Sequence, residues 1–250
     1  MNETTKLHRL DIALLHRGLV RSRAQAKDFI RRGFVEVNGQ PARRLSAIVT
    51  PDTAIRVSEE APHYVSRGAE KLLQGLEEFG MTPSGRIALD VGSSTGGFTE
   101  ILLSKGANHV FAVDVGRAQL HDSLRRRPDV TTLEGTDIRT LCASELRHPI
   151  EAITIDVSFI SLAKVLPSVF RLAGANCWMI ALIKPQFELG PSAVGRGGQL
   201  RPAADTTRAT EEIQSFVAGQ PDWNVNGIVE SPILGGAGNR EFLIAAQKYS

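Results

Sequence analysis

Apolar runs alternate with helical patterns along most of the chain. Short apolar runs predict β-strands at 87–91, 110–114, 130–133, 151–156, 177–183, 225–230 and 241–246. Between them, apolar residues recur every three to four positions, which predicts helices at about 66–79, 97–105, 118–126, 160–172 and 205–218. Strands that alternate with helices in this way form a parallel sheet with helices on both faces. We therefore expect an α/β domain with a seven-stranded, mostly parallel sheet.

The first 60 residues follow a different pattern. One helical segment covers 7–20, and a second begins after Ser22 and ends before Gly33. Short apolar segments then predict small strands at 34–39, 47–49 and 54–57. The dipeptide Ala61-Pro62 interrupts both patterns. The sequence thus predicts a small α+β domain at 1–60, a linker at 61–65 and the α/β domain at 66–250.

Charge distinguishes the two predicted domains. The chain carries a net charge of +2, but the first 60 residues hold 11 Lys/Arg and 7 Asp/Glu, so the remainder is slightly acidic. A basic excess on a small domain is typical of a nucleic-acid-binding module joined to a roughly neutral enzyme. A basic helical face with no partner is the alternative. The basic side chains of the second helical segment are Arg21, Arg23, Lys27, Arg31 and Arg32.

Cysteine and histidine usage narrows the chemistry. The two cysteines, Cys142 and Cys177, are isolated, and the six histidines lack metal-ligand spacing. We therefore expect neither a disulfide framework nor a metal site. The N-terminal sequence has no signal-peptide core, and the longest unbroken apolar run is too short to span a bilayer. A cytoplasmic protein without membrane attachment is the simplest interpretation.

A glycine-rich turn follows the strand at 87–91 and reads Asp90-Val-Gly-Ser-Ser-Thr-Gly-Gly-Phe98. Glycines let a ligand approach the backbone, and the amides of the next helix face it. The turn matches neither the dinucleotide fingerprint nor a P-loop. Asp114 ends the next strand, where an acid can hold ribose hydroxyls. Acids without a phosphate site suit S-adenosylmethionine, and the candidate contacts are Gly92, Ser94, Gly96, Gly97, Asp114, Asp137 and Asp156, with Asp90 supporting the turn.

Charged residues also end the later strands. Asp156 follows the strand at 151–156, and Lys184 follows the apolar run at 177–183. A lysine that ends an apolar strand is costly unless it is paired or used, so Asp156 is its expected partner. Lys71 is the only lysine of its helix, and Glu241 opens the last strand. These four residues are our candidates for catalysis.

Two sets of motifs carry a family resemblance. The first 60 residues are similar to the S4 RNA-binding domain, and the elements that match are Arg9-Leu-Asp11, Ser22-Arg23, Ala26-Lys27, Ile30-x-x-Gly33 and Val35-x-Val37-Asn38-Gly39. The remainder resembles the Rossmann-like methyltransferase fold, and Lys71, Asp156, Lys184 and Glu241 occur in the order of the Lys-Asp-Lys-Glu tetrad of FtsJ-like ribose 2′-O-methyltransferases. With Ser66-Arg-Gly-Ala-x-Lys-Leu and Asp156-Val-Ser-Phe-Ile-Ser-Leu, the whole chain resembles the TlyA family, whose members are called ribosomal RNA methyltransferases and also haemolysins.

The resemblance implies 2′-O-methylation of cytidine in 16S and/or 23S ribosomal RNA with S-adenosylmethionine. A ribose hydroxyl must lose its proton as the methyl group arrives. A lysine with the ordinary pKa of about 10.4 is protonated at neutral pH, so a lysine base needs burial or a neighbouring ammonium to be effective. We interpret Lys184 as the base, Asp156 as its orienting partner, and Lys71 and Glu241 as positioning groups.

Three other functions compete with this one. A base methyltransferase would need an Asn/Asp-Pro-Pro-Tyr/Phe loop where Asp156-Val-Ser-Phe stands, or a cysteine nucleophile, which neither cysteine suits. A non-catalytic RNA-binding factor of ribosome assembly would not need the four charged residues. A membrane-lytic haemolysin would need a membrane-active segment, which the sequence does not show.

Overall fold

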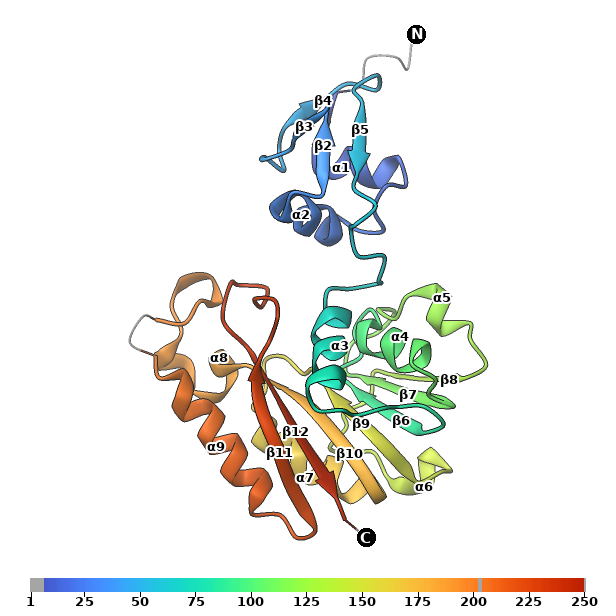
Figure 1. The fold of residues 1–250 in the computed structure, drawn as a ribbon, viewed down its shortest axis with the longest axis vertical. Coiled ribbons are helices and arrows are strands. Elements are labelled where there is room, and N and C mark those ends of the chain that lie inside the picture. Colours follow the sequence, from blue (N-terminus) through green and yellow to red (C-terminus); the bar gives the residue numbers. More distant parts are fainter. Residues whose placement is uncertain (1–6, 202–203, 250) are drawn as a thin grey trace. The chain divides into compact units, whose positions relative to one another are not determined.

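The computed structural model describes residues 7–201 and 204–249 (Figure 1). Contacts within the chain divide it into two units, Met1–Arg67 and Gly68–Ser250. The first unit holds the small strands and the two helices of the basic segment. The second holds the large sheet with the remaining helices.

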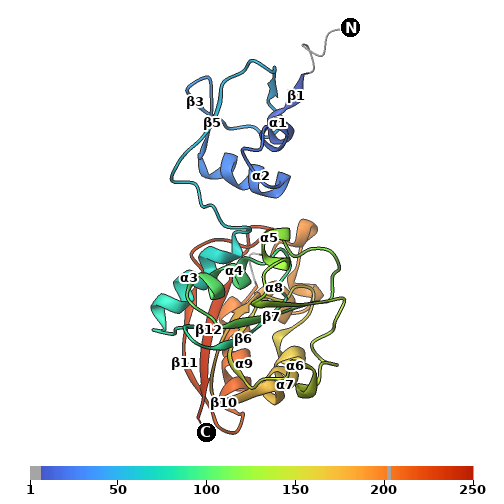
Figure 2. The same cartoon turned by 90° about the vertical axis from the view of Figure 1, so that its right-hand side faces the viewer.

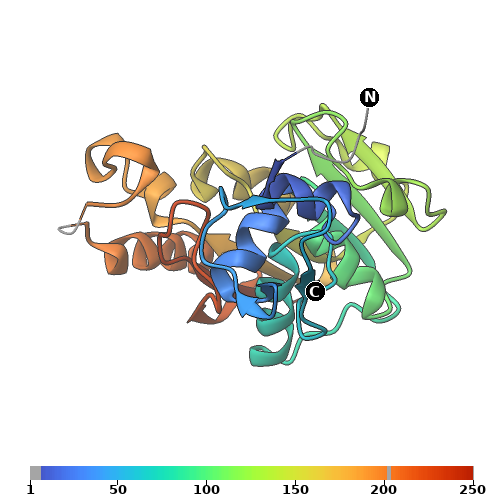
Figure 3. The same cartoon turned by 90° about the horizontal axis from the view of Figure 1, so that it is seen from above.

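The first unit is a small α+β domain. Helices α1 (Leu10–His16) and α2 (Arg23–Arg32) pack together and appear in blue in Figure 3. Ser22 caps α2 by accepting a hydrogen bond from the amide of Gln25 at 3.1 Å, and Gly33 ends it in a left-handed conformation, as the sequence predicts. The strands are β1 (His8–Arg9), β2 (Val35–Val37), β3 (Gln40–Pro41), β4 (Ile48–Val49) and β5 (Ile55–Val57), in sheets ordered β3-β2-β5 and β1-β4.

A seven-stranded sheet forms the centre of the second unit, as predicted. Its order is β11-β12-β10-β9-β6-β7-β8. The strands β6 to β10 pair in parallel, whereas β12 runs antiparallel to both of its neighbours. Their bounds are β6 (Ile87–Val91), β7 (His109–Asp114), β8 (Val130–Glu134), β9 (Ile150–Ile155), β10 (Ala173–Ile183), β11 (Trp223–Glu230) and β12 (Phe242–Lys248).

Helices cover both faces of this sheet. Helices α3 (Gly68–Glu78) and α4 (Gly97–Ser104) lie on one face, and α7 (Leu162–Leu172) and α9 (Thr206–Ala218) lie on the other (Figure 2). Apolar residues of the strands are buried between these layers. Three short helices join the strands, namely α5 (Asp122–Arg125), α6 (Ala143–Leu146) and α8 (Pro185–Glu188).

The helix predicted at 118–126 is wrong in length, because only Asp122–Arg125 is helical. Ala118 has a left-handed backbone with φ +54°, which a helix does not allow. The carboxylate of Glu134 accepts hydrogen bonds from the amides of Ala118, Gln119 and Leu120. These tertiary bonds replace the first helical turn with a loop.

Candidate active site

An ion pair joins the ends of two neighbouring parallel strands. Asp156 follows β9 and Lys184 follows β10, which pair with Ala181 opposite Ile155. The ammonium nitrogen of Lys184 lies 2.6 Å from Oδ1 of Asp156. It also donates a hydrogen bond to Oγ of Ser158 at 2.8 Å. Lys184 therefore has the partner that the sequence predicts.

A second ion pair joins Lys71 and Glu241, whose Nζ and Oε2 atoms lie 2.6 Å apart. Only 8% of Lys71 and 3% of Glu241 are exposed to solvent. Gly75 makes this burial feasible, because a Cβ there would lie 3.3 Å from Ile180 of β10. Helix α3 thus packs closely on the sheet and holds Lys71, one turn earlier, against Glu241.

The antiparallel direction of β12 brings the two ion pairs together at the carboxyl end of the parallel strands. Phe242, the first residue of β12, lies opposite Ile183, the last residue of β10. Glu241 and Lys184 therefore leave the sheet at neighbouring positions. Gln186, two residues after Lys184, donates a hydrogen bond to Oε1 of Glu241 at 3.3 Å. Nothing in the sequence distinguishes Gln186, since an amide side chain in a short turn is ordinary.

A cavity of about 530 Å³ adjoins the Asp156–Lys184 pair. Its volume is in the range of sites that hold small organic ligands. Five of the eight predicted cofactor contacts line it: Gly92, Ser94, Asp114, Asp137 and Asp156. Asp90, Gly96 and Gly97 do not.

The glycine-rich turn forms the floor of this cavity. Gly92 has φ +82°, and a Cβ there would lie 2.6 Å from the carbonyl oxygen of Asp156. Only glycine fits such an approach of two strand ends. The Asp114 carboxylate accepts the amide of Ser94 at 2.8 Å and that of Gly116 at 2.7 Å. Asp114 is therefore fixed at the wall of the cavity by two backbone donors.

Asp90 and Gly96 support the turn from behind. Asp90 is fully buried and accepts hydrogen bonds from Thr99 at 2.6 Å and Thr154 at 3.1 Å. Burial raises the pKa of Asp90 to about 7 despite these bonds. Gly96 has φ +100°, a conformation that favours glycine, and a Cβ there would also displace Cδ1 of Leu124, which would lie 2.3 Å away. The position of these residues fits support of the turn, not contact with a ligand.

Asp137 has a partner of its own within the cavity wall. Its carboxylate forms an ion pair with Arg139 at 2.6 Å. The Arg139 guanidinium holds the pKa of Asp137 below its ordinary value. Arg139 is the sole basic residue among those lining the cavity, so the wall is acidic overall.

Phe159 is a functional candidate that the sequence reasoning missed. Its backbone has φ +65° and its side chain is 91% exposed, although it lines the cavity. The ring lies 5.2 Å from that of Phe187. A left-handed backbone is rare for an aromatic residue, and strained residues of this kind cluster at functional sites. In the sequence, an apolar residue just after a strand is indistinguishable from a core residue.

The predicted RNA-binding side chains are all exposed on or beside α2, in two groups. Arg23 pairs with the buried carboxylate of Asp11 at 2.9 Å, and Arg32 pairs with Asp28 at 3.4 Å. These two arginines therefore also stabilise the unit. The side chains of the other group are exposed without a described ion pair, and they are Arg21, Lys27 and Arg31.

The described residues give little support for a cysteine nucleophile or a metal site. Burial raises the pKa of Cys177 to about 12, which makes its thiol a poor nucleophile, and Cys142 does not line the cavity. No group of three or more histidine, cysteine or acidic residues in the described ranges could hold a metal ion.

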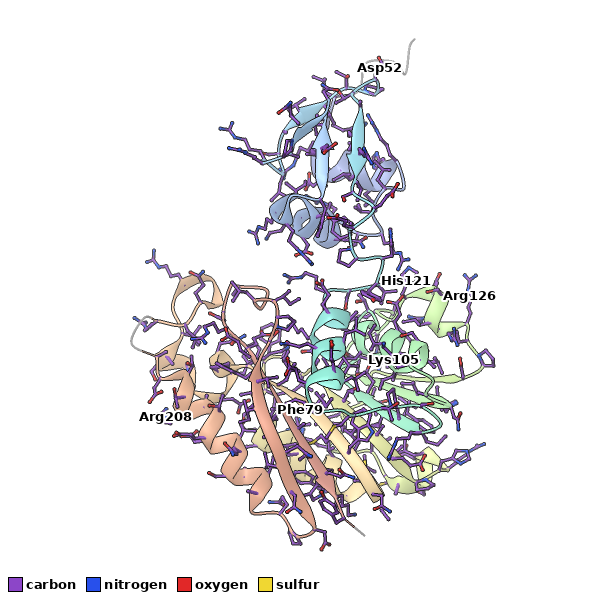
Figure 4. The ribbon with its side chains drawn as sticks, viewed as in Figure 1. Asp52, Phe79, Lys105, His121, Arg126 and Arg208 are labelled. Atoms are coloured by element: carbon purple, nitrogen blue, oxygen red, sulfur yellow. The ribbon has the colours of Figure 1, made fainter. Side chains whose placement is uncertain are left out.

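Arg126 of the basic run at 125–127 points outward (Figure 4) and pairs with Asp122. Within 7–201 and 204–249, no helix is both long and apolar enough to cross a bilayer.

Each of the two units matches a known protein family. A model of the S4 domain matches residues 8–55, and a model of the FtsJ-like methyltransferase family matches residues 64–248. The chain is 41% identical over 237 residues to the 16S/23S rRNA (cytidine-2′-O)-methyltransferase TlyA of Mycobacterium tuberculosis, covering 94% of this chain and 88% of the relative. It is 35% identical to Hemolysin A of Brachyspira hyodysenteriae, covering 94% of this chain and 98% of the relative.

A solved structure has the same architecture. A protein of known structure from Streptococcus thermophilus is 34% identical, with a TM-score of 0.77, and the match covers 98% of this chain and 89% of the other. The family models and the level of identity to these relatives agree with one another. The chain therefore belongs to the FtsJ-like methyltransferases, in the TlyA family that carries an N-terminal S4 domain.

Proposed function

We propose that this protein uses S-adenosylmethionine to methylate the ribose 2′-hydroxyl of cytidine in 16S and/or 23S ribosomal RNA. The observation that carries the proposal is the meeting of two lysine–carboxylate pairs at one edge of the sheet, beside an acidic cavity. The name of the M. tuberculosis relative supports the choice of substrate.

The cavity residues fit the proposed cofactor. S-adenosylmethionine carries a sulfonium and an ammonium group but no phosphate. The cavity wall holds three carboxylates: Asp137 is paired with Arg139 and Asp156 with Lys184, whereas Asp114 accepts two backbone amides, so the wall has a net negative charge. Such a wall attracts a cationic ligand and repels a phosphate. Asp114 would hold the ribose hydroxyls, and Asp156 lies where the cavity meets Lys184.

The tetrad prepares the hydroxyl for reaction. When bound, S-adenosylmethionine supplies an electrophilic methyl group. Once the Lys184 ammonium has released its own proton, Nζ would accept the proton of the ribose 2′-hydroxyl, and Asp156 with Ser158 holds that nitrogen in place. Lys71 and Glu241 form a buried second pair that orients the ribose. Holding the hydroxyl close to the methyl group accounts for much of the expected rate.

Phe159 supports a nucleoside substrate. An exposed ring at the cavity mouth gives a nucleobase an apolar face on which to stack. A nucleotide lifted out of folded RNA loses stacking on its neighbours, and such a ring offsets part of that loss. We infer that Phe159 receives the target base.

Ribosomal RNA from cells with and without the gene tests the function directly. We expect one or more cytidines to carry a ribose methyl group only when the gene is present, as mapped by mass spectrometry. A gene copy encoding Lys184→Ala is the matched control, since its product should leave these positions unmethylated. Identical ribose methylation in all three strains would reject the function and favour a non-catalytic role in ribosome assembly. A gain of methyl groups on bases alone would identify a base methyltransferase.

The S4 unit should supply RNA affinity through phosphate contacts. Changing Lys27 and Arg31 to glutamate should weaken binding to ribosomal RNA. The plot of log K against log salt has a negative slope, and its magnitude should fall by about 2, one for each lost phosphate contact. Filter binding across a salt series measures this slope. Lys105→Glu is the control, because it changes the charge of the other unit, at the end of α4 (Figure 4). An unchanged slope for the double variant would show that α2 does not contact phosphates.

A further inference from the structure

One wall of the cavity is a loop between β7 and α5. Three of its residues, Val115, Gly116 and Gln119, line the cavity. The amide of Gly116 binds Asp114, and its carbonyl accepts the amide of Gly135 at 2.8 Å. The beginning of the loop is therefore fixed by hydrogen bonds to the last residue of β7 and to the residue that follows β8.

In the second half of the loop, three successive amides share one carboxylate, while Arg125 also donates to the carbonyl of Leu120 at 3.1 Å. Glu134, the last residue of β8, accepts the amides of residues 118, 119 and 120 at 3.0, 2.6 and 2.8 Å. Arg125 also lies 3.2 Å from it, and only 11% of the Glu134 side chain is exposed. Burial opposes ionisation, but the three amides and Arg125 hold the pKa of Glu134 below its ordinary value. Successive amides of this kind normally form a concavity that binds an anionic ligand. Here the protein fills it with its own side chain.

This arrangement directs Gln119 toward the cavity. Its side chain crosses Gly116 so closely that a Cβ at Gly116 would lie 1.9 Å from Nε2 of Gln119. The same Cβ would lie 3.0 Å from Oδ1 of Asp114, so the Gln119 amide sits beside the carboxylate proposed to hold the ribose. An amide has both a donor and an acceptor for a purine nucleoside.

We propose that Gln119 contacts the adenosine part of the cofactor and that Glu134 is the residue that positions it. Glu134 does not reach the cavity itself. It acts by holding the amides of residues 118–120, and so sets where the Gln119 side chain enters the cavity. The inference rests on the proposed cofactor and adds two residues to its site.

Binding of S-adenosylhomocysteine, measured by isothermal titration calorimetry, tests the proposal. We expect Gln119→Ala and Glu134→Gln each to weaken binding about tenfold, the cost of one lost or misplaced hydrogen bond. If Glu134 acts through Gln119, the double variant should bind no more weakly than the poorer single variant. Losses that multiply would instead show that Glu134 acts independently of Gln119, and would overturn its positioning role.

Glu151→Gln is the matched control. Glu151 also accepts a backbone amide, that of Ile87 at 2.9 Å, but it lies at the amino end of the parallel strands, away from the cavity. Its substitution should leave the affinity unchanged, whereas a tenfold loss would show that such bonds matter only through general stability. If Glu134→Gln does not fold, Glu134→Asp, which withdraws the carboxylate by one methylene, takes its place in the cycle.

Failure of the inference can be told apart from failure of the proposed function. Wild-type protein that does not bind S-adenosylhomocysteine would contradict the cofactor itself. Wild-type protein that binds it, together with a Gln119→Ala variant of equal affinity, would contradict only the role of Gln119.

Discussion

Replacing Lys184 with alanine should slow methyl transfer to ribosomal RNA by about 10²–10⁴-fold, the usual effect of removing a general base. Binding of cofactor and RNA should change far less than the rate, because Lys184 itself does not line the cavity and the residues that do line it are unchanged. The single-turnover rate on ribosomal subunits measures the chemical step. Thermal melting of each variant serves as the stability control.

Lys184→Arg distinguishes a base from a structural cation. A guanidinium keeps its proton at every working pH, so this variant should pair with Asp156 and yet remain inactive. If charge alone mattered, arginine would preserve both stability and rate. An active Lys184→Arg protein would therefore remove Lys184 from the role of base and leave positioning as the source of catalysis.

Lys71→Ala should destabilise the second unit by about 3–5 kcal/mol, since it leaves the buried carboxylate of Glu241 without its partner. The double variant Lys71→Met, Glu241→Gln removes both charges and should recover most of this loss. Urea unfolding measures the free energy of each variant. Equal stability of the single variant and the wild type would show that the pair contributes nothing in solution.

Activity should not follow stability in this series. The double variant should remain inactive on ribosomal RNA, because neither methionine nor glutamine can hold the ribose as a buried ion pair does. Arg208→Met, on the exposed face of α9 (Figure 4), is the control for a lost cation. A stable and fully active double variant would refute the positioning role of Lys71 and Glu241.

The order of apolar runs was sufficient to predict the sheet, because its inner strands are buried on both faces and therefore read as continuous apolar runs. The helix predicted at 118–126 failed for a tertiary reason: the carboxylate of Glu134 competes for the amides that would begin it. Such competition depends on how two distant segments meet, which periodicity within one segment does not report.

Site residues were predictable from the sequence where a charged residue directly adjoins an apolar run. Lys184 was found in this way, and so was its partner, because a buried ammonium needs a carboxylate. Gln186, Phe159 and Gln119 were missed, since each is an unremarkable residue in its own segment. Their importance arises from what lies opposite them in space.

The antiparallel last strand has a consequence for when the enzyme can act. Lys71 and Glu241 are 170 residues apart in the chain, so the contact between them closes a very long loop. Contacts of this kind form late, after the local βα units. A chain in which β12 has not yet entered between β10 and β11 has an unpaired sheet edge and only three members of the tetrad. We therefore expect catalytic competence to come late in folding, so that a chain without β12 in place should bind RNA on its S4 unit without modifying it.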